Sequence, residues 1–453
     1  MARVGILASS DVIALLLAGA LAYLLWAGPV HGQPVLLYLP AAPVAFLMVM
    51  GYAQARLYPG FGLGPVEVLR RYWLVTALSF LAMAALVLAL KLDNVYSRVT
   101  LVFAFTLSLT LVPLLRGGAL RLARRLRWWP EPVVLVGSGE GMERMRRAME
   151  ARSTAEFRPA GAIVAAGSGD STPDAWTGEA YGYVSAGVRV ALADPVVAGD
   201  AASMDRLRSV FPRVIVLREF QQLPVEGVQI RNLGGLLGLE YGNNLLDRQS
   251  RWVKRSLDLS LATVALILTL PIMLAAMLAV KVLSPGPALF WQEREGRKGR
   301  TIRVPKIRTM VPDAERRMEE LLRSDPVLRA EWESAFKLKH DPRVIPRIGR
   351  IFRRFSIDEL PQLWSVVRGD MSLVGPRPFP GYHLAALSPH ARRLRDEVRP
   401  GITGLWQVTS RGEAGIEAQQ VYDVYYIRNW SVWLDLHILA RTVRVVLSGQ
   451  GAY

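Results

Sequence analysis

Four long apolar segments constrain the fold of this chain more than any other feature of its sequence. They cover residues 4–26, 34–53, 72–90 and 99–115. Each is long enough, or nearly so, to cross about 30 Å of hydrocarbon as an α-helix. Hydrophobic residues also make up 51% of the 453 residues, which is unusual for a water-soluble protein with a net charge of +17. The pattern predicts a membrane protein with a four-helix transmembrane bundle over residues 1–128.

The positive charge follows the apolar segments along the chain. Residues 1–128 carry a net charge of +8 and residues 248–453 carry +13, whereas residues 129–247 carry −4. A basic surface beside a bilayer suits anionic lipid headgroups and phosphorylated substrates, so we expect membrane lipid and no nucleic acid as partner. The chain has no cysteine, which excludes disulfides, thiol nucleophiles and cysteine-bound metals. Its five histidines have no metal-ligand spacing.

Arginine and lysine are distributed between the loops in a way that sets the orientation of the bundle. The first loop, residues 28–33, contains neither, and the third contains only Lys91 and Arg98. The second loop and the segment after the fourth helix contain most of the charge: Arg56, Arg70, Arg71, Arg116, Arg121, Arg124, Arg125 and Arg127. Such residues stay on the cytoplasmic side, so both ends of the bundle are expected there. Asp11, the acidic residue inside the first segment, is expected to pack between helices or to snorkel to the interface, with a functional role as the alternative.

Residues 129–247 have a different pattern, in which short β-rich runs alternate with helical stretches. This alternation predicts a Rossmann-like βαβ domain with a parallel sheet. The turn after its first strand, Gly-Ser-Gly-Glu-Gly-Met at residues 137–142, resembles a dinucleotide-binding fingerprint. However, the third glycine is displaced and no acidic residue ends the second strand. A structural or regulatory role is therefore favoured over a nucleotide site.

A further apolar segment, residues 254–283, begins the last third of the chain. Its length suggests a fifth span, but basic residues lie on both sides of it. A full crossing would also move a domain of charge +13 out of the cytoplasm, against the positive-inside rule. Pro271 removes a backbone donor in the middle of the segment and favours a break. We therefore predict a re-entrant helix that bends at Pro271, with a simple kinked span as the alternative.

The densest chemical signal is Phe-Ser-Ile-Asp-Glu-Leu-Pro-Gln-Leu at residues 355–363. Ser356 and Glu359 have the spacing of a capping box, so we expect a helix to begin here. Asp358 and Glu359 would lie in its first turn, where the helix dipole favours negative charge and an ionised Asp358. Two adjacent carboxylates suit a reaction in which one is a nucleophile and the other holds a divalent metal. A plain helix cap is the alternative.

Cations placed between prolines and glycines accompany this segment in the sequence. Arg377 lies between two prolines that restrict its backbone, which suits a guanidinium that grips phosphate with two hydrogen bonds. Lys306 and Arg308 follow a short predicted strand, and Arg399 precedes a glycine-rich turn that leads to Gln407. These conformationally restricted cations indicate that the two carboxylates belong to an active site that binds phosphate.

Residues 250–453 closely resemble the bacterial sugar transferases, the monotopic phosphoglycosyl transferase superfamily. The resemblance runs through the segments described above and also through residues 286–290, 398–404 and 423–426. The bundle, the middle domain and the terminal Gly-Ala-Tyr are similar to the undecaprenyl-phosphate galactose phosphotransferase subgroup, so the likeness covers essentially the whole chain. The re-entrant helix of the family commonly breaks at a Ser-Pro pair, where this chain has Leu270 and Pro271.

The resemblance implies an α/β membrane protein with three parts. These are the transmembrane bundle (residues 1–128), the Rossmann-like accessory domain (129–247) and a catalytic domain on the re-entrant helix (248–453). The expected location is the bacterial inner membrane, with the accessory and catalytic domains in the cytoplasm. The large accessory region also leads us to expect a homodimer.

The implied reaction transfers a sugar-1-phosphate from a UDP-sugar to undecaprenyl phosphate with release of UMP, and begins a surface polysaccharide. Galactose is the favoured sugar and glucose is the alternative. We expect Asp358 to form a covalent phosphosugar intermediate and Glu359 to hold Mg²⁺. The expected substrate-binding residues are Lys306, Arg308, Arg377, Arg399, Gln407 and Asp423. A nucleotide-sugar oxidoreductase that uses the middle domain and a non-catalytic assembly scaffold are the alternatives from other classes.

Overall fold

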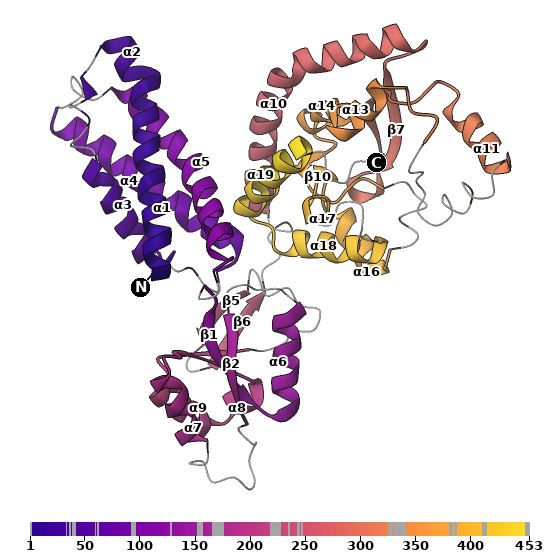
Figure 1. The fold of residues 1–453 in the computed structure, drawn as a ribbon. Coiled ribbons are helices and arrows are strands. Elements are labelled where there is room, and N and C mark those ends of the chain that lie inside the picture. Colours follow the sequence, from indigo (N-terminus) through magenta and orange to yellow (C-terminus); the bar gives the residue numbers. More distant parts are fainter. Residues whose placement is uncertain are drawn as a thin grey trace. The chain divides into compact units, whose positions relative to one another are not determined.

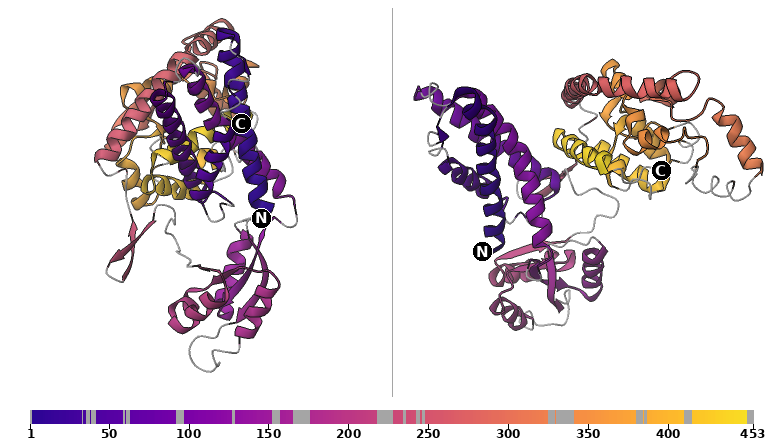
Figure 2. Two further views of the ribbon diagram at one scale, coloured as in Figure 1. Left: turned by 90° about the vertical axis from the view of Figure 1, so that its left-hand side faces the viewer. Right: turned by 45° about the horizontal axis from the view of Figure 1, so that its top comes forward.

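The chain forms two compact units, Met1–Leu223 and Pro224–Tyr453, and each is described by itself. The computed structural model describes residues 2–32, 34–35, 38, 42–58, 60, 63–91, 97–126, 129–151, 157–164, 176–217, 228–233, 236–241, 245, 248–324, 329, 341–379, 384, 387–409 and 415–448. Figures 1 and 2 show the elements of both units from three directions.

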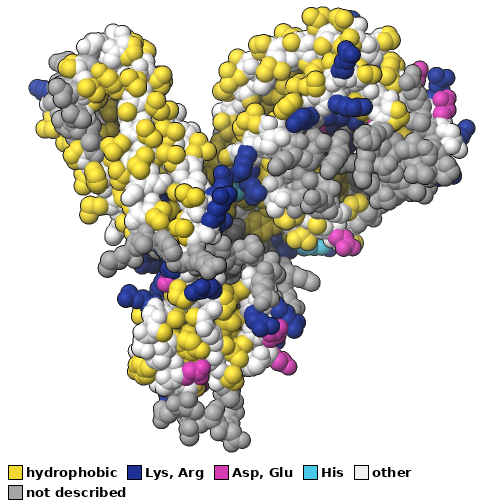
Figure 3. All heavy atoms as spheres, in the orientation of Figure 1, with side chains coloured by type: hydrophobic (Ala, Val, Ile, Leu, Met, Phe, Trp, Pro, Cys, Tyr) yellow, Lys and Arg dark blue, Asp and Glu magenta, His cyan; other side chains and the backbone are white. Residues whose placement is uncertain are grey.

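The first unit begins with an apolar helical bundle. Its long helices are α1 (Ala2–Ala22), which continues through the π-helical turn η1 (Tyr23–Ala27) into α2 (Gly28–His31), α4 (Pro65–Ala89) and α5 (Arg98–Ala123). Helix α1 packs along α5, and both are apolar and long enough to cross a membrane, as is α4. Large hydrophobic side chains are exposed along these helices, and Figure 3 shows them covering the visible face of the bundle. Such a surface fits lipid surroundings and agrees with the predicted membrane protein.

The structure describes the second predicted apolar segment, residues 34–53, only in part. Helix α3 spans only Ala42–Gln54, which is 13 residues and therefore about 20 Å. Its second residue is Pro43, and proline is favoured at the first positions of a helix because it lacks the N–H that later turns need. By itself α3 is shorter than the hydrocarbon thickness of about 30 Å.

Asp11 packs between the helices of the bundle, as the sequence predicts. The side chain is fully buried, and its Oδ2 accepts hydrogen bonds from Arg116 Nη1 and from the Tyr58 hydroxyl, both at 2.6 Å. Arg116 also donates to the carbonyl of Leu57. Arg116 is therefore not one of the loop cations that set the orientation, because it lies inside α5 and neutralises Asp11.

The middle of the chain forms a four-stranded parallel sheet with strand order β2-β1-β3-β4, in agreement with the predicted alternation. Its strands are β1 (Glu131–Gly137), β2 (Phe157–Val164), β3 (Val190–Ala193) and β4 (Arg213–Val216). The helices between them are α6 (Gly139–Ala151), α7 (Thr177–Ser185), α8 (Pro195–Gly199) and α9 (Ala201–Val210). Successive residues of β1 point to opposite faces, so Val134 and Val136 join one buried cluster while Val133 and Leu135 join the other.

The second unit contains the long helix α10 (Arg248–Leu283) and a small mixed domain. Its strands are β5 (Val228–Leu233) with β6 (Leu236–Tyr241), β7 (Leu289–Glu295) with β8 (Thr301–Ile307), and β9 (Ser372–Val374) with β10 (Gly401–Thr403). The first two pairs are antiparallel hairpins and the third pair is parallel. The helices are α11 (Ala314–Ser324), α13 (Ile348–Arg354), η5 (Ile357–Glu359), α14 (Gln362–Arg368), α16 (Pro389–Asp396), α17 (Leu405–Thr409), α18 (Ile416–Arg428) and α19 (Val432–Ser448).

Helix α10 is apolar and long enough to cross a membrane, and it contains Pro271. Backbone hydrogen bonding stays helical over all 36 residues, but Figure 1 shows that the helix changes direction part-way along its length. A proline inside a helix lacks one hydrogen bond and is a common cause of such bends. Near its carboxyl end, Ala276 and Val280 pack with Ile307 and Phe352 in a core that supports η5.

Candidate active site

Asp358 and Glu359 lie in η5, a single 3₁₀ turn that leads into α14. The predicted capping box is wrong, because the Ser356 side chain makes no capping hydrogen bond and its backbone has a left-handed φ of 53°. The Glu359 carboxylate accepts instead from two cations, and charge-assisted bonds of this kind are stronger than a bond to a backbone N–H. A non-glycine residue in the left-handed region is costly and is characteristic of functional sites.

Glu359 joins three segments that are distant in the sequence. Lys306 Nζ from β8 and Arg377 Nη2 from the loop after β9 both donate to its Oε1, each at 2.9 Å. Burial alone would raise the pKa of Glu359, but the charges of Lys306 and Arg377 lower it well below its usual range. This carboxylate therefore stays ionised at any physiological pH. The sequence predicted all three residues as part of one site, and the structure brings them together.

Asp358 has the opposite electrostatic environment from its neighbour. Its side chain is buried, and burial together with the negative charge of Glu359 raises its pKa to about 6. Lys306 and Arg353 oppose this shift but do not cancel it. The shift is opposite to that expected from a helix dipole, since η5 is one short turn and burial dominates. Because pH 7 lies about one unit above this pKa, the group is still roughly nine-tenths ionised there.

A second chain of contacts fixes the backbone of Arg377. Arg395 of α16 donates to the Arg377 carbonyl and to the Asp423 carboxylate of α18, and it lies 4.3 Å from the centre of the Phe379 ring. Asp423 was expected to bind substrate, but only 2% of it is exposed. Burial outweighs the charge of Arg395 and raises the pKa of Asp423 to about 6. Asp423 therefore acts on Arg377 indirectly: it binds Arg395, which in turn holds the Arg377 backbone carbonyl.

Three other expected substrate-binding residues lie apart from the contacts of Glu359. Arg308 is buried and donates from Nη2 to the Ser284 carbonyl at 2.9 Å, at the end of α10. Arg399 donates from Nε to the Gly369 carbonyl at 2.8 Å. Gln407 is also buried, and its amide donates to the Ile402 carbonyl at 3.3 Å.

Two arginines near the site were missed by the sequence argument. Arg353 donates to the Thr309 hydroxyl at 3.0 Å and acts electrostatically on Asp358. Its position five residues before Asp358, in a run of basic residues, was the signal that could have found it. Arg395 had no such signal, because its importance depends on α16 packing against α18.

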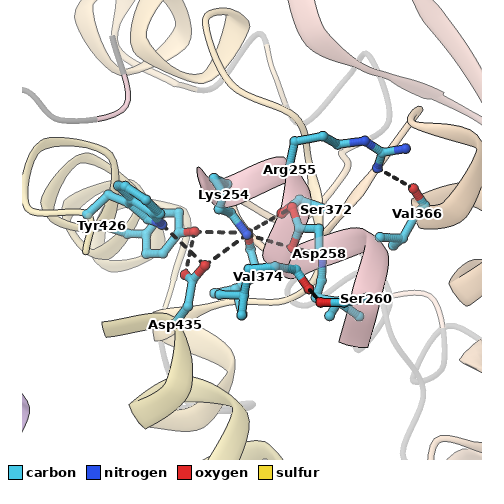
Figure 4. Close-up of polar contacts among 12 residues, drawn as sticks. Lys254, Arg255, Asp258, Ser260, Val366, Ser372, Val374, Tyr426 and Asp435 are labelled. Carbon is cyan, nitrogen blue, oxygen red and sulfur yellow. Dashed lines mark hydrogen bonds and ion pairs between the residues drawn. The ribbon is translucent and has the colours of Figure 1, made fainter. Parts of the chain in front are cut away.

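A buried polar network connects the start of α10 to the loop that carries Arg377 (Figure 4). Lys254 Nζ lies 2.8 Å from an Asp258 oxygen and 2.9 Å from an Asp435 oxygen. Asp258 also accepts from the Ser372 hydroxyl at 2.7 Å, and Tyr426 donates to Asp435 at 2.8 Å. Since Ser372 begins β9, the network fixes α10 against the strand that precedes Arg377.

The fingerprint-like turn of the middle domain is occupied by a side chain of the domain itself. Asp194 Oδ2 accepts from the backbone N–H of Ser138 at 2.8 Å and from its hydroxyl at 3.0 Å. Asp194 Oδ1 accepts from Val197 N–H at 2.8 Å, and a Cβ at Gly141 would clash with the same carboxylate. A nucleotide phosphate normally binds at the helix end that follows such a turn. A carboxylate there repels phosphate, which favours the structural role over a nucleotide site.

The carboxylate pair is suited to magnesium even though no larger ligand cluster accompanies it. Among the residues that the structure describes, no three His, Asp or Glu side chains gather to hold a metal. Mg²⁺ usually takes one or two carboxylates and completes its shell with substrate phosphates and water. Asp358 and Glu359 fit this pattern, because they are adjacent and belong to a site that also holds Lys306 and Arg377.

The chain is similar in sequence to several known proteins. A family model described as bacterial sugar transferase matches residues 249–449. The chain is 34% identical over 383 residues to the undecaprenyl-phosphate galactose phosphotransferase of Salmonella typhimurium, which covers 79% of this chain and 77% of that protein. It is 33% identical over 380 residues to the UDP-galactose-lipid carrier transferase of Erwinia amylovora, a match that covers 79% of this chain and 76% of that protein. The UDP-glucose:undecaprenyl-phosphate glucose-1-phosphate transferase of Caulobacter vibrioides is 40% identical over 211 residues, a match that covers 44% of this chain and 72% of that protein.

Proposed function

The chain belongs to the bacterial sugar transferase family, and from this premise we propose that it transfers galactose-1-phosphate from UDP-galactose to undecaprenyl phosphate. It is a membrane enzyme of the undecaprenyl-phosphate sugar phosphotransferase type. The observation that carries the proposal is the meeting of Lys306 and Arg377 at Glu359, directly beside the buried Asp358. The product would begin the synthesis of an O-antigen, capsule or exopolysaccharide.

The choice of galactose rests on how far each similarity extends. The two relatives named for galactose match 79% of the chain, whereas the relative named for glucose matches 44% of it. Similarity that includes the accessory regions favours galactose, with glucose as the alternative. An oxidoreductase that uses the middle domain is disfavoured by the carboxylate of Asp194 in the fingerprint-like turn.

In the proposed first step, an ionised Asp358 oxygen attacks the β-phosphorus of the UDP-sugar. A bond forms between that oxygen and phosphorus, the bond to the bridging oxygen breaks, and UMP leaves with the electron pair. In the second step a phosphate oxygen of undecaprenyl phosphate attacks the same phosphorus, which releases the carboxylate of Asp358. Burial makes Asp358 more basic than an ordinary aspartate and helps it to act as a nucleophile.

Positive charge must accompany this chemistry, because a carboxylate attacks a phosphorus that already carries negative oxygens. Lys306 and Arg377 place two cations at Glu359, the residue next to Asp358, where they would stabilise charge that develops on the phosphoryl oxygens. Arg395, which is paired with Asp423, holds the Arg377 backbone in place through its carbonyl. Mg²⁺, held in part by Glu359, would neutralise the phosphates when it is bound.

We also propose that α10 enters the inner membrane from the cytoplasm, bends at Pro271 and returns. The bend in Figure 1 and the basic residues at both ends of the segment support this. Residues 1–128, 129–247 and 248–453 would be the bundle, accessory and catalytic domains, the last two in the cytoplasm. Labelling of Lys298→Cys in this cysteine-free chain tests the topology, with Val35→Cys as the control on the other side. Labelling of Lys298→Cys only from the periplasm would contradict re-entry.

The reaction itself is tested by UMP release from UDP-galactose and UDP-glucose in the presence of undecaprenyl phosphate. We expect Mg²⁺-dependent release that is faster with UDP-galactose, and a trapped phosphosugar adduct when the lipid acceptor is omitted. Asp358→Asn should abolish both, whereas Glu359→Gln should retain an adduct. An adduct on Asp358→Asn would exclude this nucleophile, and UMP release absent under all conditions would favour the scaffold. The mass of the solubilised enzyme tests the expected homodimer.

A further inference from the structure

A strongly basic pocket lies at the turn of the β7–β8 hairpin, apart from the carboxylate pair. It has a volume of about 270 Å³. Arg297, Lys298 and Arg300 come from the hairpin turn, and Arg399 comes from the segment before β10. Among the described residues that line the pocket, one is acidic, Asp370. The pocket therefore gathers four cations around one carboxylate.

The positive charge of this pocket is not balanced by the protein. Asp370 already forms an ion pair with Arg368, which is not one of the four cations of the pocket. The buried Nε of Arg297 has no hydrogen-bond partner among the described residues. Burial, Arg255 and Arg297 together lower the pKa of Arg399, which reflects like charges held close to one another. Such a cluster is stabilised by an anion that enters from outside.

The anion that fits here is not the reacting phosphate of either substrate. Helix α14, seven residues and about 10 Å long, lies between η5 and Gly369, which lines the pocket. The two phosphates of a UDP-sugar share one oxygen, so a donor whose β-phosphorus meets Asp358 cannot extend its other phosphate to the pocket. The acceptor phosphate must also reach the phosphorus bound to Asp358. The pocket therefore suits a third phosphate group.

The surroundings of the pocket indicate where that phosphate comes from. Arg255, in the second turn of α10, donates to the Val366 and Val367 carbonyls, and its guanidinium lies beside Gly369 in the pocket wall. Trp252, one turn earlier, is 65% exposed. An adjoining pocket of about 620 Å³ shares Asp370 with the first and contains the exposed Trp291. Tryptophan and arginine together at the end of a membrane helix are typical of the headgroup level of a bilayer.

We propose that the basic pocket formed by Arg297, Lys298, Arg300 and Arg399 binds the phosphate headgroup of an anionic phospholipid. The bound lipid ties the hairpin turn and the amino end of α10 to the membrane surface while the catalytic pair stays open to substrates. This inference rests on the proposed placement of α10 in the membrane. It does not depend on the identity of the sugar or on the covalent step.

The test compares two double variants of the full chain in nanodiscs that contain phosphatidylglycerol and undecaprenyl phosphate in neutral phosphatidylcholine. Arg297→Gln with Arg300→Gln removes two pocket cations. Arg316→Gln with Arg323→Gln removes two cations from α11, where both side chains are more than 70% exposed. Native mass spectrometry counts the phosphatidylglycerol molecules retained after release from the disc. A thermal melt of each variant shows that it is folded.

We expect the pocket variant to retain phosphatidylglycerol with about 25-fold weaker affinity, since each cation near the surface contributes about fivefold. The α11 variant should match the wild type. Equal retention by both variants overturns the proposal, as does displacement of the lipid by UMP, which would make the pocket a nucleotide site. Preferential retention of undecaprenyl phosphate would make it an acceptor site instead. UMP release is measured on the same samples, so loss of lipid binding with normal turnover, or the reverse, separates this inference from the proposed function.

Discussion

Asp358→Asn should stop turnover and at the same time stabilise the fold. The side chain is 9% exposed, and burial with the nearby charge of Glu359 raises its pKa from 3.8 to about 6. A carboxyl whose native pKa exceeds the unfolded value stabilises the fold fully below about pH 4, and this stabilisation is lost as the pH rises through 6. At pH 7 and above, a shift of about two units therefore costs about 3 kcal/mol of unfolding free energy. Asparagine cannot ionise and avoids this cost.

The pH dependence of the effect separates this cause from a general change in packing. We expect the melting temperature of Asp358→Asn in detergent to exceed that of the wild type by up to about 6–12 °C at pH 8, given about 2–4 °C per kcal/mol for a unit of this size. The difference should fall to about half at pH 5, where Asp358 is protonated in the folded protein but ionised in the unfolded chain, and should approach zero below about pH 4. Wild-type UMP release should fall over the same range, because the nucleophile must be ionised. Asp313→Asn, at a side chain that is 62% exposed, is the matched control.

Two results would refute this reasoning. A gain in melting temperature that is equal at pH 5 and pH 8 would show that ionisation of Asp358 is not its cause. A melting temperature that falls at pH 8 would show that the Asp358 carboxylate is a net stabilising group in the fold. Either result would also remove the argument that burial makes this side chain an unusually basic nucleophile.

Three further substitutions test the surrounding structure. Glu359→Gln removes the anionic acceptor shared by two cations, and a titration of UMP release with Mg²⁺ should show a higher metal requirement while the adduct still forms. Lys254→Met leaves two buried carboxylates without their cation, which should cost about 3–5 kcal/mol and reduce the yield of folded protein on size exclusion. Asp194→Ala removes the cap of α8 and should destabilise the middle domain by about 1–2 kcal/mol in a thermal melt, with UMP release unchanged.

The parts of the fold that depend on local pattern were predictable from the sequence. Apolar runs gave the long helices of the bundle and α10, and alternating strands and helices gave the parallel sheet of the middle domain. Over the described residues, helix α3 covers Ala42–Gln54 of its apolar run. Arg116 was assigned to a loop because its partner, Asp11, is 105 residues away, and no local pattern reveals such a pair.

The active site was predictable in its members but not in its electrostatics. Glu359, Lys306 and Arg377 were identified from residue type and motif, and they do meet. The direction of the pKa shift of Asp358 was not predictable, since it depends on burial by segments that pack around η5. The position of Asp423 behind Arg377 likewise depends on Arg395, which comes from another helix.

The opposite pKa shifts of the two neighbouring carboxylates suit a two-step transfer. Lys306 and Arg377 keep Glu359 ionised, and its fixed negative charge helps to raise the pKa of Asp358. A more basic oxygen attacks phosphorus faster, yet a pKa of about 6 still leaves most Asp358 ionised at neutral pH. Once Asp358 is bound to phosphorus it no longer carries this charge, and the repulsion from Glu359 is relieved. Glu359 therefore destabilises the free nucleophile more than the covalent intermediate, which lowers the barrier of the first step.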